Sequence, residues 1–389
     1  MLPLIRLGTA HAATHHYVIA NNNAFPTNTV SVYEVSGASL VPLPTVPTGG
    51  TGSGGGYFAG VTQAVVQDGT NTCVFVGDAG SMDISAMRMV TRSPYLKVVS
   101  NYASPDGDAD VAGLGIITSN GYLYANYTGN TINGGSVNPA LGVWKIGSGC
   151  KLSFVGQLAN TSGLNGGAID GMAVTPNGKY LVVAYGDGSV GSYAIGDGSI
   201  SLIGQEIIAG NAIGTAEAEG VAISKNGRWA IFGDFTFGGT QLDVASIGPD
   251  GTLALTITYG GSGSLGNGVG DGSIRLSPNN DFVFNVDTYS GQETTVSFDA
   301  KTGVIAYPSA CLTNLNGYQS LWSYASQVAM MADSGSGTKL YISEGLGGQQ
   351  SYIALLEVNA TTGCATEVQG SPFVDSNGPY LESITAFSH

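Results

Sequence analysis

Short apolar runs separated by glycine-containing turns follow one another along the chain. Residues 164–210 and 216–261 show the pattern most clearly. Each reads as an apolar strand, an Asn-Gly turn, a second apolar strand, an acidic loop, an alternating strand, a Gly turn and a final strand. Asn177-Gly178 and Asn226-Gly227, each between two apolar runs, are strong hairpin signals. The pattern predicts units of four antiparallel strands.

Weaker copies of this unit flank the two clear ones. Each copy has four strand-like runs over about 45–55 residues, the period expected of propeller blades. The copies span residues 57–104, 108–160, 266–315 and 317–373. Six units are therefore recognisable within the body of the chain.

The two ends of the chain complete one further unit. Residues 16–47 lack a first strand, and residues 380–389, YLESITAFSH, are a first strand with nothing after it. Joined, they would close a ring and remove a free sheet edge. The sequence predicts an all-β, seven-bladed β-propeller of four-stranded antiparallel blades, closed by the N- and C-terminal strands. A β-solenoid has shorter repeats, and two sandwiches would not leave complementary half-repeats at the termini.

Several segments resemble the repeats of one known family. HYVIANN (16–22), TPNGKYLVVAYGDGSVGSYAI (175–195) and SPNNDFVFNVD (277–287) are similar to repeats of the lactonase-like seven-bladed propellers, the YVTN-type family. The resemblance covers nearly the whole chain after Ala13 and suggests a secreted bacterial member. It implies the propeller fold and hydrolysis of a lactone or ester. One propeller scaffold hosts many functions, so the fold is the firmer implication.

The N-terminus has the features of the end of a signal peptide. Ala10-His11-Ala12 fits the small-x-small cleavage pattern, although the apolar part before it is short and interrupted by Arg6. We expect residues 1–12 to be the remnant of a signal peptide and residues 13–389 to form one propeller domain. The location would be periplasmic or extracellular. No run of 18 apolar residues exists, so we expect no transmembrane segment.

Charge narrows the choice of ligands. Lys and Arg number 12 against 27 Asp and Glu, which gives a net charge of −15. Such a field repels nucleic acid and anionic lipid and favours neutral or cationic ligands. We expect a small neutral or cationic ligand, or a protein or glycan partner, no nucleic acid, and a monomer.

The four cysteines are placed to form disulfides between neighbouring blades. They have no CxxC spacing and no nearby His, which disfavours a zinc site. Four cysteines allow three pairings. Cys73 and Cys150 fall in adjacent units, as do Cys311 and Cys364, whereas a crossing pair would have to span the disc. We predict Cys73–Cys150 and Cys311–Cys364; the alternative is four buried thiols.

Acidic residues recur where the first strand of a unit begins and where its second strand ends. In a propeller, these two places lie on the same face of the disc. The strand-entry acids are Asp110, Asp170, Glu217, Glu219, Asp271 and Glu382. The strand-exit acids are Asp78, Asp187, Asp234, Asp287 and Glu344. For the exit acids we favour ordinary turn chemistry, because Asp and Gly make good turns. For Asp170, Glu219 and Glu382 we favour a carboxylate-lined channel mouth, because a turn before an apolar strand needs no acid; Asp271 and Asp110 align with them less closely.

Closely spaced carboxylates demand a cation or raise one another's pKa. We predict candidate site residues Asp110, Asp170, Glu219, Asp271 and Glu382, with Asp170 and Glu219 as ligands of Ca²⁺ or another divalent cation. No His lies inside a blade, so a Ser-His-Asp triad is not expected. Arg275, inside a first strand, would pair with the channel acids or form a structural salt bridge.

Two functions remain open at this stage. One is an exported, cation-assisted lactone or ester hydrolase that uses the acidic channel mouth. The other is a non-catalytic extracellular module that binds a ligand or protein on the same face. The family resemblance favours the first. The absence of His within the blades and the scarcity of basic residues favour the second, since the related enzymes use His and Arg for a phosphorylated substrate.

Overall fold

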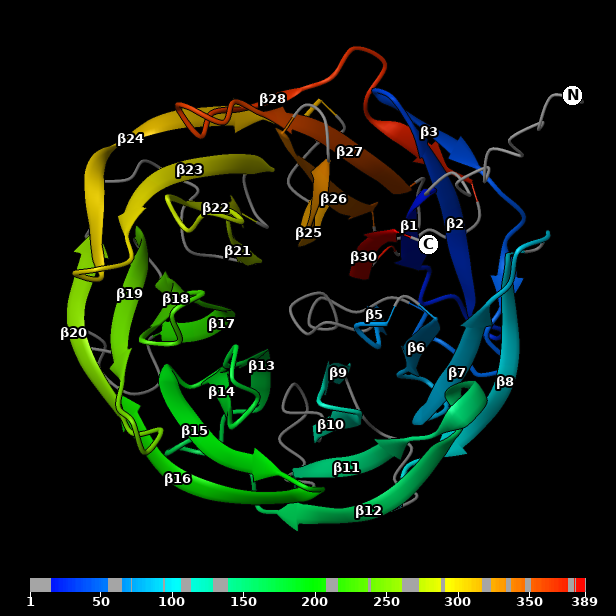
Figure 1. The fold of residues 1–389 in the computed structure, drawn as a ribbon, viewed down its shortest axis with the longest axis horizontal. Coiled ribbons are helices and arrows are strands. Elements are labelled where there is room, and N and C mark those ends of the chain that lie inside the picture. The colour runs from blue at the N-terminus through cyan, green and yellow to red at the C-terminus, as the bar shows by residue number, and fades with distance from the viewer. Residues whose placement is uncertain are drawn as a thin grey trace, which may run out of the picture.

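The computed structural model shows seven sheets arranged around a central axis (Figure 1). The residues described are 15–54, 65–70, 72–93, 95–105, 113–128, 139–207, 216–236, 239–260, 273–287, 291–316, 323–333, 337–346, 351–376, 381 and 383–388. Each sheet has four antiparallel strands, and two sheets carry a short fifth strand. The predicted seven-bladed β-propeller is therefore confirmed.

The strands of the first three blades follow the predicted repeat. Blade 1 contains β30 (Ser383–Ser388), β1 (His16–Asn21), β2 (Thr29–Ser36), β3 (Ser39–Pro42) and β4 (Val46–Pro47). Blade 2 contains β5 (Val65–Gln67), β6 (Cys73–Asp78), β7 (Asp83–Met89) and β8 (Leu96–Ala103). Blade 3 contains β9 (Gly113–Ser119), β10 (Tyr122–Thr128), β11 (Ala140–Ile146) and β12 (Leu152–Ala159).

The other four blades run on along the chain in the same order. Blade 4 contains β13 (Ile169–Val174), β14 (Tyr180–Tyr185), β15 (Ser189–Gly196) and β16 (Ser199–Ile207). Blade 5 contains β17 (Ala216–Ile223), β18 (Trp229–Thr236), β19 (Gly239–Ile247) and β20 (Leu253–Gly260). Blade 6 contains β21 (Ile274–Leu276), β22 (Phe282–Asp287), β23 (Gln292–Asp299) and β24 (Val304–Asn314). Blade 7 contains β25 (Ser323–Asp333), β26 (Gly337–Leu346), β27 (Ser351–Val358), β28 (Ala365–Glu367) and β29 (Phe373–Asp375).

The ring closes as the sequence predicts. β30 pairs antiparallel with β1, from His16 opposite Ser388 to Asn21 opposite Ser383. The C-terminal strand is thus the innermost strand of the blade that the N-terminus begins. Backbone pairing of this kind removes the free edges that an open sheet would expose.

The core lies between blades rather than inside them. Each apolar cluster joins two neighbouring sheets; one, for example, contains Val18 and Ile384 of blade 1 together with Tyr341 and Leu355 of blade 7. The middle strands are consequently buried on both faces, as the pattern BBBBBB of β6 shows. Burial of this apolar surface is the main force that holds the blades together.

The topology gives the disc two distinct faces. We call the face with the turns between first and second strands, and between third and fourth strands, the turn face. The opposite face, where first strands begin and second strands end, is the loop face. On the turn face, hydrogen bonds join neighbouring blades, such as Asn226 Nδ2 to the Ala300 carbonyl (2.7 Å) and Tyr180 Oη to the Pro249 carbonyl (2.7 Å).

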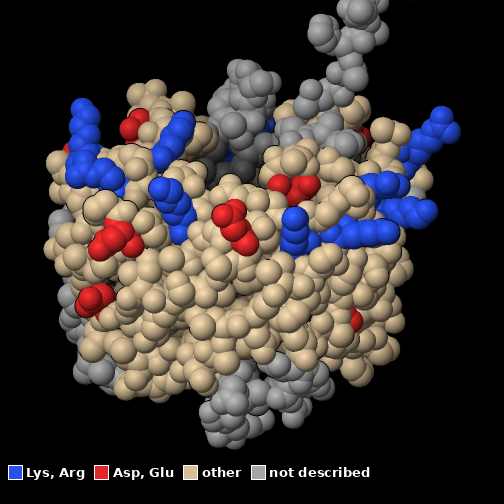
Figure 2. Space-filling view, turned by 60° about the horizontal axis from the view of Figure 1, so that its bottom comes forward, with Lys and Arg blue, Asp and Glu red and all other residues tan. Residues whose placement is uncertain are grey.

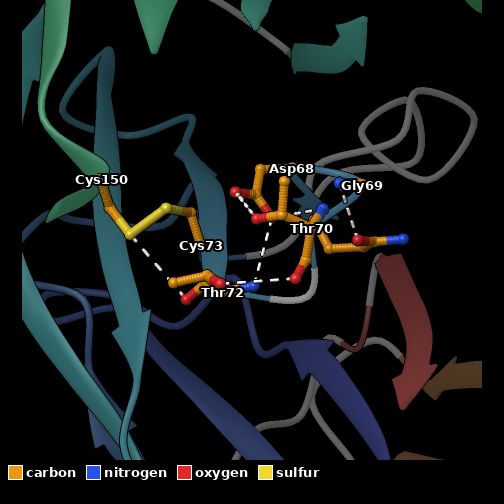
Figure 3. Close-up of a disulfide and its surroundings, with 7 residues drawn as sticks. Asp68, Gly69, Thr70, Thr72, Cys73 and Cys150 are labelled. Atoms are coloured by element: carbon orange, nitrogen blue, oxygen red, sulfur yellow. Dashed lines mark hydrogen bonds between the residues drawn. A yellow bond between two sulfur atoms is a disulfide. The ribbon is translucent and has the colours of Figure 1, made fainter. Parts of the chain in front are cut away.

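Both predicted disulfides are present and join neighbouring blades. Cys73 in β6 bonds Cys150, in a short 3₁₀ turn (Ser148–Cys150) before β12, with Cα atoms 5.4 Å apart. Cys311 in β24 bonds Cys364, and their Cα atoms are 5.3 Å apart. Figure 3 shows that the first bridge lies beside the turn at Asp68. The Asp68 carboxylate accepts hydrogen bonds from the backbone amides of Thr70 and Thr72. Within the described residues, no helix is long and apolar enough to span a membrane.

Candidate functional site

The loop-face ends of the inner strands carry irregular pairing at matching heights. In β13, Ile169 pairs with Tyr185 and Gly171 with Ala184, which leaves Asp170 as an extra residue. In β17, a register shift between Ala218 and Val221 includes Glu219. Bulges turn side chains out of the regular alternation and are frequent next to functional sites. The acids predicted for the channel mouth at these two positions therefore both sit at such irregularities.

The blade-7 inner strand has a shift at the same place. Ala325 pairs with Glu344 and Gln327 with Ser343, so that Ser326 is the extra residue. The feature is thus repeated in three of the inner strands, with an acid at the position in two of them. This repetition marks the loop-face ends of the inner strands as the candidate site.

Asp170 is the predicted site residue whose side chain the structure describes. It is half-buried, and a Cβ atom on Gly186 would come within 2.5 Å of its Oδ2. Glycine at 186 therefore lets the carboxylate lie against the end of β14. Asp110, Asp271, Glu382 and the side chain of Glu219 lie outside the described residues. Their gathering with Asp170 stays a prediction.

The predicted cation site also stays a prediction. Within the described residues, no three His, Cys, Asp or Glu side chains come close enough together to hold a metal ion. Asp170 contributes one carboxylate, and hard cations such as Ca²⁺ take six or more oxygen ligands. The described side chains alone do not fit the predicted Ca²⁺, and we derive no chemical step through it.

Of the strand-exit acids, Asp187 has a structural role. Its Oδ2 accepts hydrogen bonds from the amides of Asn165 (2.7 Å) and Gly167 (3.1 Å), and its Oδ1 accepts from the Ser189 amide (3.0 Å) and hydroxyl (2.5 Å). Burial raises its pKa, but these hydrogen bonds outweigh that effect and leave the pKa below its usual value. Asp187 thereby fixes the loop that leads into β13.

Asp78, at the end of β6, holds the corresponding loop of blade 2. Its Oδ1 accepts from Asn28 Nδ2 (2.7 Å) and Thr48 Oγ1 (2.7 Å), and its Oδ2 contacts the Ser85 hydroxyl. A Cβ atom on Gly50 would lie 2.5 Å from this carboxyl group, so the loop can approach only as glycine. Asp187 thus binds residues of its own and the preceding turn, whereas Asp78 is fully buried and binds Asn28 and Thr48 of blade 1. The side chains of Asp234, Asp287 and Glu344 lie outside the described residues.

Burial of Asp78 favours its neutral form, and the hydrogen bonds from Ser85, Thr48 and Asn28 only partly oppose this effect. Ser85 Oγ lies 3.0 Å from the Thr48 carbonyl oxygen and can form a hydrogen bond with it only as the donor. The same hydroxyl accepts a hydrogen bond from Asn101 Nδ2 (2.7 Å). A hydroxyl has one proton. If Ser85 donates it to the Thr48 carbonyl, Asp78 must supply the proton on the Asp78–Ser85 contact. Burial, partly offset by the three hydrogen bonds, accordingly raises the Asp78 pKa to about 7.

This arrangement predicts how stability depends on pH. Asp78 has a folded pKa of about 7 against an ordinary value of 3.8, so the native state holds the proton more tightly between these values. Stability from this group is greatest at low pH and falls as pH rises through 7. Asp78→Asn should remove the fall, because the amide mimics the neutral acid. We expect the unfolding free energies of variant and wild type to diverge by about 2–4 kcal/mol between pH 5 and pH 8 in urea titrations.

Asp187→Asn is the matched control for this experiment. Its folded pKa is lowered, so its contribution is lost only as pH falls below the ordinary value, and it should be constant between pH 5 and pH 8. If the difference in unfolding free energy between the wild type and Asp78→Asn is the same at pH 5 and pH 8, Asp78 is not neutral in the folded protein.

Basic residues are segregated from the loop face. Arg6 lies outside the described residues and Arg275 lies in the inner strand β21. All other Lys and Arg residues lie within or beside turns of the turn face: Arg88, Arg92, Lys97, Lys145, Lys151, Lys179, Lys225, Arg228, Lys301 and Lys339. Figure 2 shows the Lys and Arg side chains gathered along one rim of the disc. In the described part of the chain, basic residues other than Arg275 therefore lie away from the loop face.

Comparisons with solved structures agree with this architecture. A 6-phosphogluconolactonase candidate from Bacteroides uniformis is 12% identical, covers 97% of this chain and 100% of its own, and superimposes with a TM-score of 0.71. The periplasmic gluconolactonase of Pseudomonas aeruginosa is 14% identical, covers 93% and 99%, and has a TM-score of 0.64. The chain has the fold of lactonase-like propellers.

Sequence comparison adds nothing to this fold assignment. No protein-family model matches the chain, and no curated protein matches it in sequence. A second 6-phosphogluconolactonase candidate, from Bacteroides fragilis, is 13% identical, covers 98% and 99% and has a TM-score of 0.67. At such identities the likeness establishes the fold, and the activity has to be argued from the site.

Sequence reasoning missed most of the polar network around Asp78. Asn21, Asn22, Asn23 and Asn28 are fully buried where β1 leads into β2. Asn21 Oδ1 accepts from Asn28 Nδ2 (2.8 Å), which links the closing blade to Asp78. The signal was the run of three consecutive Asn residues at the end of an apolar strand, at the place where other blades have an acid.

Proposed function

We propose that the protein is an extracytoplasmic hydrolase of uncharged lactones that acts at the loop-face mouth of its channel. The observation that carries the proposal is the placement of Asp170 at a bulge on the loop-face end of an inner strand. A carboxylate there can accept a proton from a water molecule bound in the channel. The fold shared with lactonase-like propellers supports this reaction class, and the two disulfides support an oxidising compartment.

The proposed reaction needs one base and one proton return. Water adds its oxygen to the lactone carbonyl carbon while the carboxylate takes a proton from that water. The bond between the carbonyl carbon and the ring oxygen then breaks, and the proton returns to the ring oxygen as a hydroxyl. The product is a hydroxy acid, which is an anion at neutral pH.

Charge segregation supports an uncharged substrate. A phosphorylated lactone needs several cationic groups to offset its phosphate. In the described part of the chain, basic residues other than Arg275 lie on the turn face, away from the candidate site. The acidic loop face would repel a phosphate dianion and admit a neutral lactone.

The test is a hydrolysis assay on purified protein with a sugar δ-lactone and its 6-phosphorylated counterpart, corrected for spontaneous opening. We expect turnover of the neutral lactone. Asp170→Asn should lower kcat about 10²–10⁴-fold, the usual contribution of a general base. Asp197→Asn is the matched control, because Asp197 is exposed in a turn of the turn face, and it should leave kcat unchanged.

A calcium arm tests the predicted cation site in the same preparation. If Asp170 and Glu219 bind Ca²⁺, calcium raises the melting temperature by binding only the native state. Asp170→Asn combined with Glu219→Gln should abolish the rise. Melting curves that are unchanged by calcium and EDTA would refute the cation site, and an absence of turnover on all lactones would refute the hydrolase and leave the ligand-binding module.

A further inference from the structure

The two disulfides differ in how far their cysteines are exposed to solvent. Cys73 and Cys150 are 5% and 0% exposed. Cys311 and Cys364 are both half-buried, and Cys364 lies in the turn between β27 and β28. Thiol–disulfide exchange requires that a thiolate reach a sulfur atom. The Cys311–Cys364 bond is therefore the one that an external thiol can reach in the folded protein.

A buried acid lies on the same face of blade 6 as this bond. Thr295 of β23 is opposite Cys311 of β24, and Glu293 is opposite Thr313. Directly opposite residues of an antiparallel sheet point to the same side, here the side of Val286, which packs on blade 7. Glu293 is 0% exposed, and its Oε1 lies 2.8 Å from Thr295 Oγ1. The carboxyl group thus leans toward the cross-strand partner of Cys311.

Two threonine hydroxyls connect this acid to the turn that carries Cys364. Thr295 Oγ1 lies 3.2 Å from the Gly363 carbonyl oxygen, and Thr313 Oγ1 lies 2.9 Å from the Ala365 carbonyl oxygen. Both carbonyls flank Cys364 directly, and both belong to blade 7. The environment of the acid and the position of the cysteine are therefore coupled across the contact between blades 6 and 7.

The hydrogen bonds and the burial of Glu293 fit its protonated form. A carbonyl only accepts, and a hydroxyl has one proton. If Thr295 donates to Gly363, Glu293 supplies the proton for its own contact with Thr295. Within the described residues, Glu293 Oε2 has no hydrogen-bond partner. Burial raises the Glu293 pKa to about 8, an effect that the threonine hydroxyls only partly oppose.

Reduction of the bond would release a thiolate in this apolar interface. A thiolate in apolar surroundings is disfavoured and needs a proton. The ordinary pKa of a cysteine thiol is about 8.5, close to that of Glu293, so transfer of a proton from the carboxyl group to the thiolate is nearly balanced. We propose that Cys311–Cys364 is a thiol–disulfide exchange site for a dithiol reductant, and that Glu293 delivers the proton to the thiolate released at Cys311.

The exchange has two steps. In the first, a thiolate of the dithiol bonds Cys364 Sγ, the bond between the two Sγ atoms breaks with its electron pair on Cys311 Sγ, and Glu293 protonates that thiolate. In the second, the other sulfur of the reductant, having lost its proton to solvent, attacks the reductant sulfur of the mixed disulfide and releases Cys364 as a thiolate. Solvent returns one proton to Cys364 and one to Glu293. The dithiol is thereby oxidised to a cyclic disulfide, and the two cysteines are reduced to thiols.

The test uses dithiothreitol on the oxidised, folded wild-type protein, with alkylation and peptide mass spectrometry to follow each bond separately. We expect Cys311–Cys364 to open about tenfold or more faster than Cys73–Cys150, which is the internal control. Expressed per dithiothreitol thiolate, the rate constant for Cys311–Cys364 should fall as pH rises through about 8, because Glu293 then loses its proton. Equal rates for the two bonds, or a rate per thiolate that does not change with pH, overturn the proposal.

Glu293→Gln separates proton delivery from packing. The amide has the shape of the neutral carboxyl group and no proton to deliver, so the Cys311–Cys364 rate at pH 7 should fall about tenfold or more and lose its pH dependence. The melting temperature should stay unchanged. Glu357→Gln is the matched control, because Glu357 is exposed on β27 of the neighbouring blade, and it should leave the rate unchanged. A Glu293→Gln variant that is reduced as fast as the wild type contradicts proton delivery, and the wild-type pH profile tests the same step if the variant does not fold.

Discussion

A chain that ends at residue 377 is expected to lose most of its resistance to unfolding. The deletion removes β30, whose six residues pair with β1 and whose Ile384 is fully buried between blades 1 and 7. It also removes the bonds from the Val65 amide to Ser383 Oγ (3.0 Å) and from the Leu381 amide to Ser351 Oγ (3.3 Å). The ring would open at an inner strand and expose the edges of β1 and the faces of two neighbouring blades.

The expected loss is large compared with the stability of a typical domain. Truncating Ile384 to Ala alone should cost about 2–5 kcal/mol. Whole domains are stable by only about 5–15 kcal/mol. Thermal melting and gel filtration should show an aggregating chain with no cooperative transition near that of the intact protein. A chain lacking residues 1–12 is the control and should melt like the full chain; a truncated protein that also does so would contradict closure by β30.

The blades, the ring closure and the disulfides could be predicted from the sequence because turn residues specify hairpins locally. Asn-Gly pairs fix hairpins locally, so Asn177-Gly178 and Asn226-Gly227 marked blades 4 and 5 from a few residues each. The complementary half-repeats at the termini then marked ring closure, because an inner strand without a blade has nowhere else to pair. Blade order, in turn, allowed one pairing of the cysteines to be chosen over the two that cross the disc.

The burial of acids could not be predicted in the same way. Glu293 in β23 is fully buried, and burial raises its pKa to about 8, partly offset by hydrogen bonds from Thr295 and Thr313. The segment QETTVSFD alternates weakly because third strands are covered on both sides by neighbouring blades. In such a strand a polar position is not a surface position. Whether an acid is charged depends on donors from other strands, here Thr295 Oγ1 at 2.8 Å, which one sequence does not reveal.

The sequence alone predicted only part of the arrangement around Asp170 and Glu219, because the backbone irregularity there depends on strand pairing. Asp170 and Glu219 were aligned by the repeat, and the register shifts of β13 and β17 fall at those residues. A bulge depends on the pairing of two strands rather than on one of them. The sequence therefore indicated which acids share a height, whereas the pairing of the strands was needed to show that the backbone is irregular there.

Removal of either disulfide is also expected to lower the stability of the protein substantially. The bridges Cys73–Cys150 and Cys311–Cys364 span 77 and 53 residues of chain. In the chain-entropy model, each bridge lowers the conformational entropy of the unfolded chain and thereby stabilises the native state by at most about 4 kcal/mol. We expect Cys73→Ala with Cys150→Ala, and separately Cys311→Ala with Cys364→Ala, to lower the unfolding free energy by about 2–4 kcal/mol each.

The two pairs lie far apart, so their effects should add, because distant sites without shared partners usually do. Adding a reductant to the wild type should reproduce the loss seen when all four cysteines are replaced and should leave that variant unchanged. Peptide mapping without reductant identifies the bonds directly. Four free thiols in protein recovered from an oxidising compartment, or a bond between Cys73 and Cys311, would contradict the pairing, since residues bridged by a disulfide need Cα atoms within about 7 Å and those blades lie on different sides of the ring.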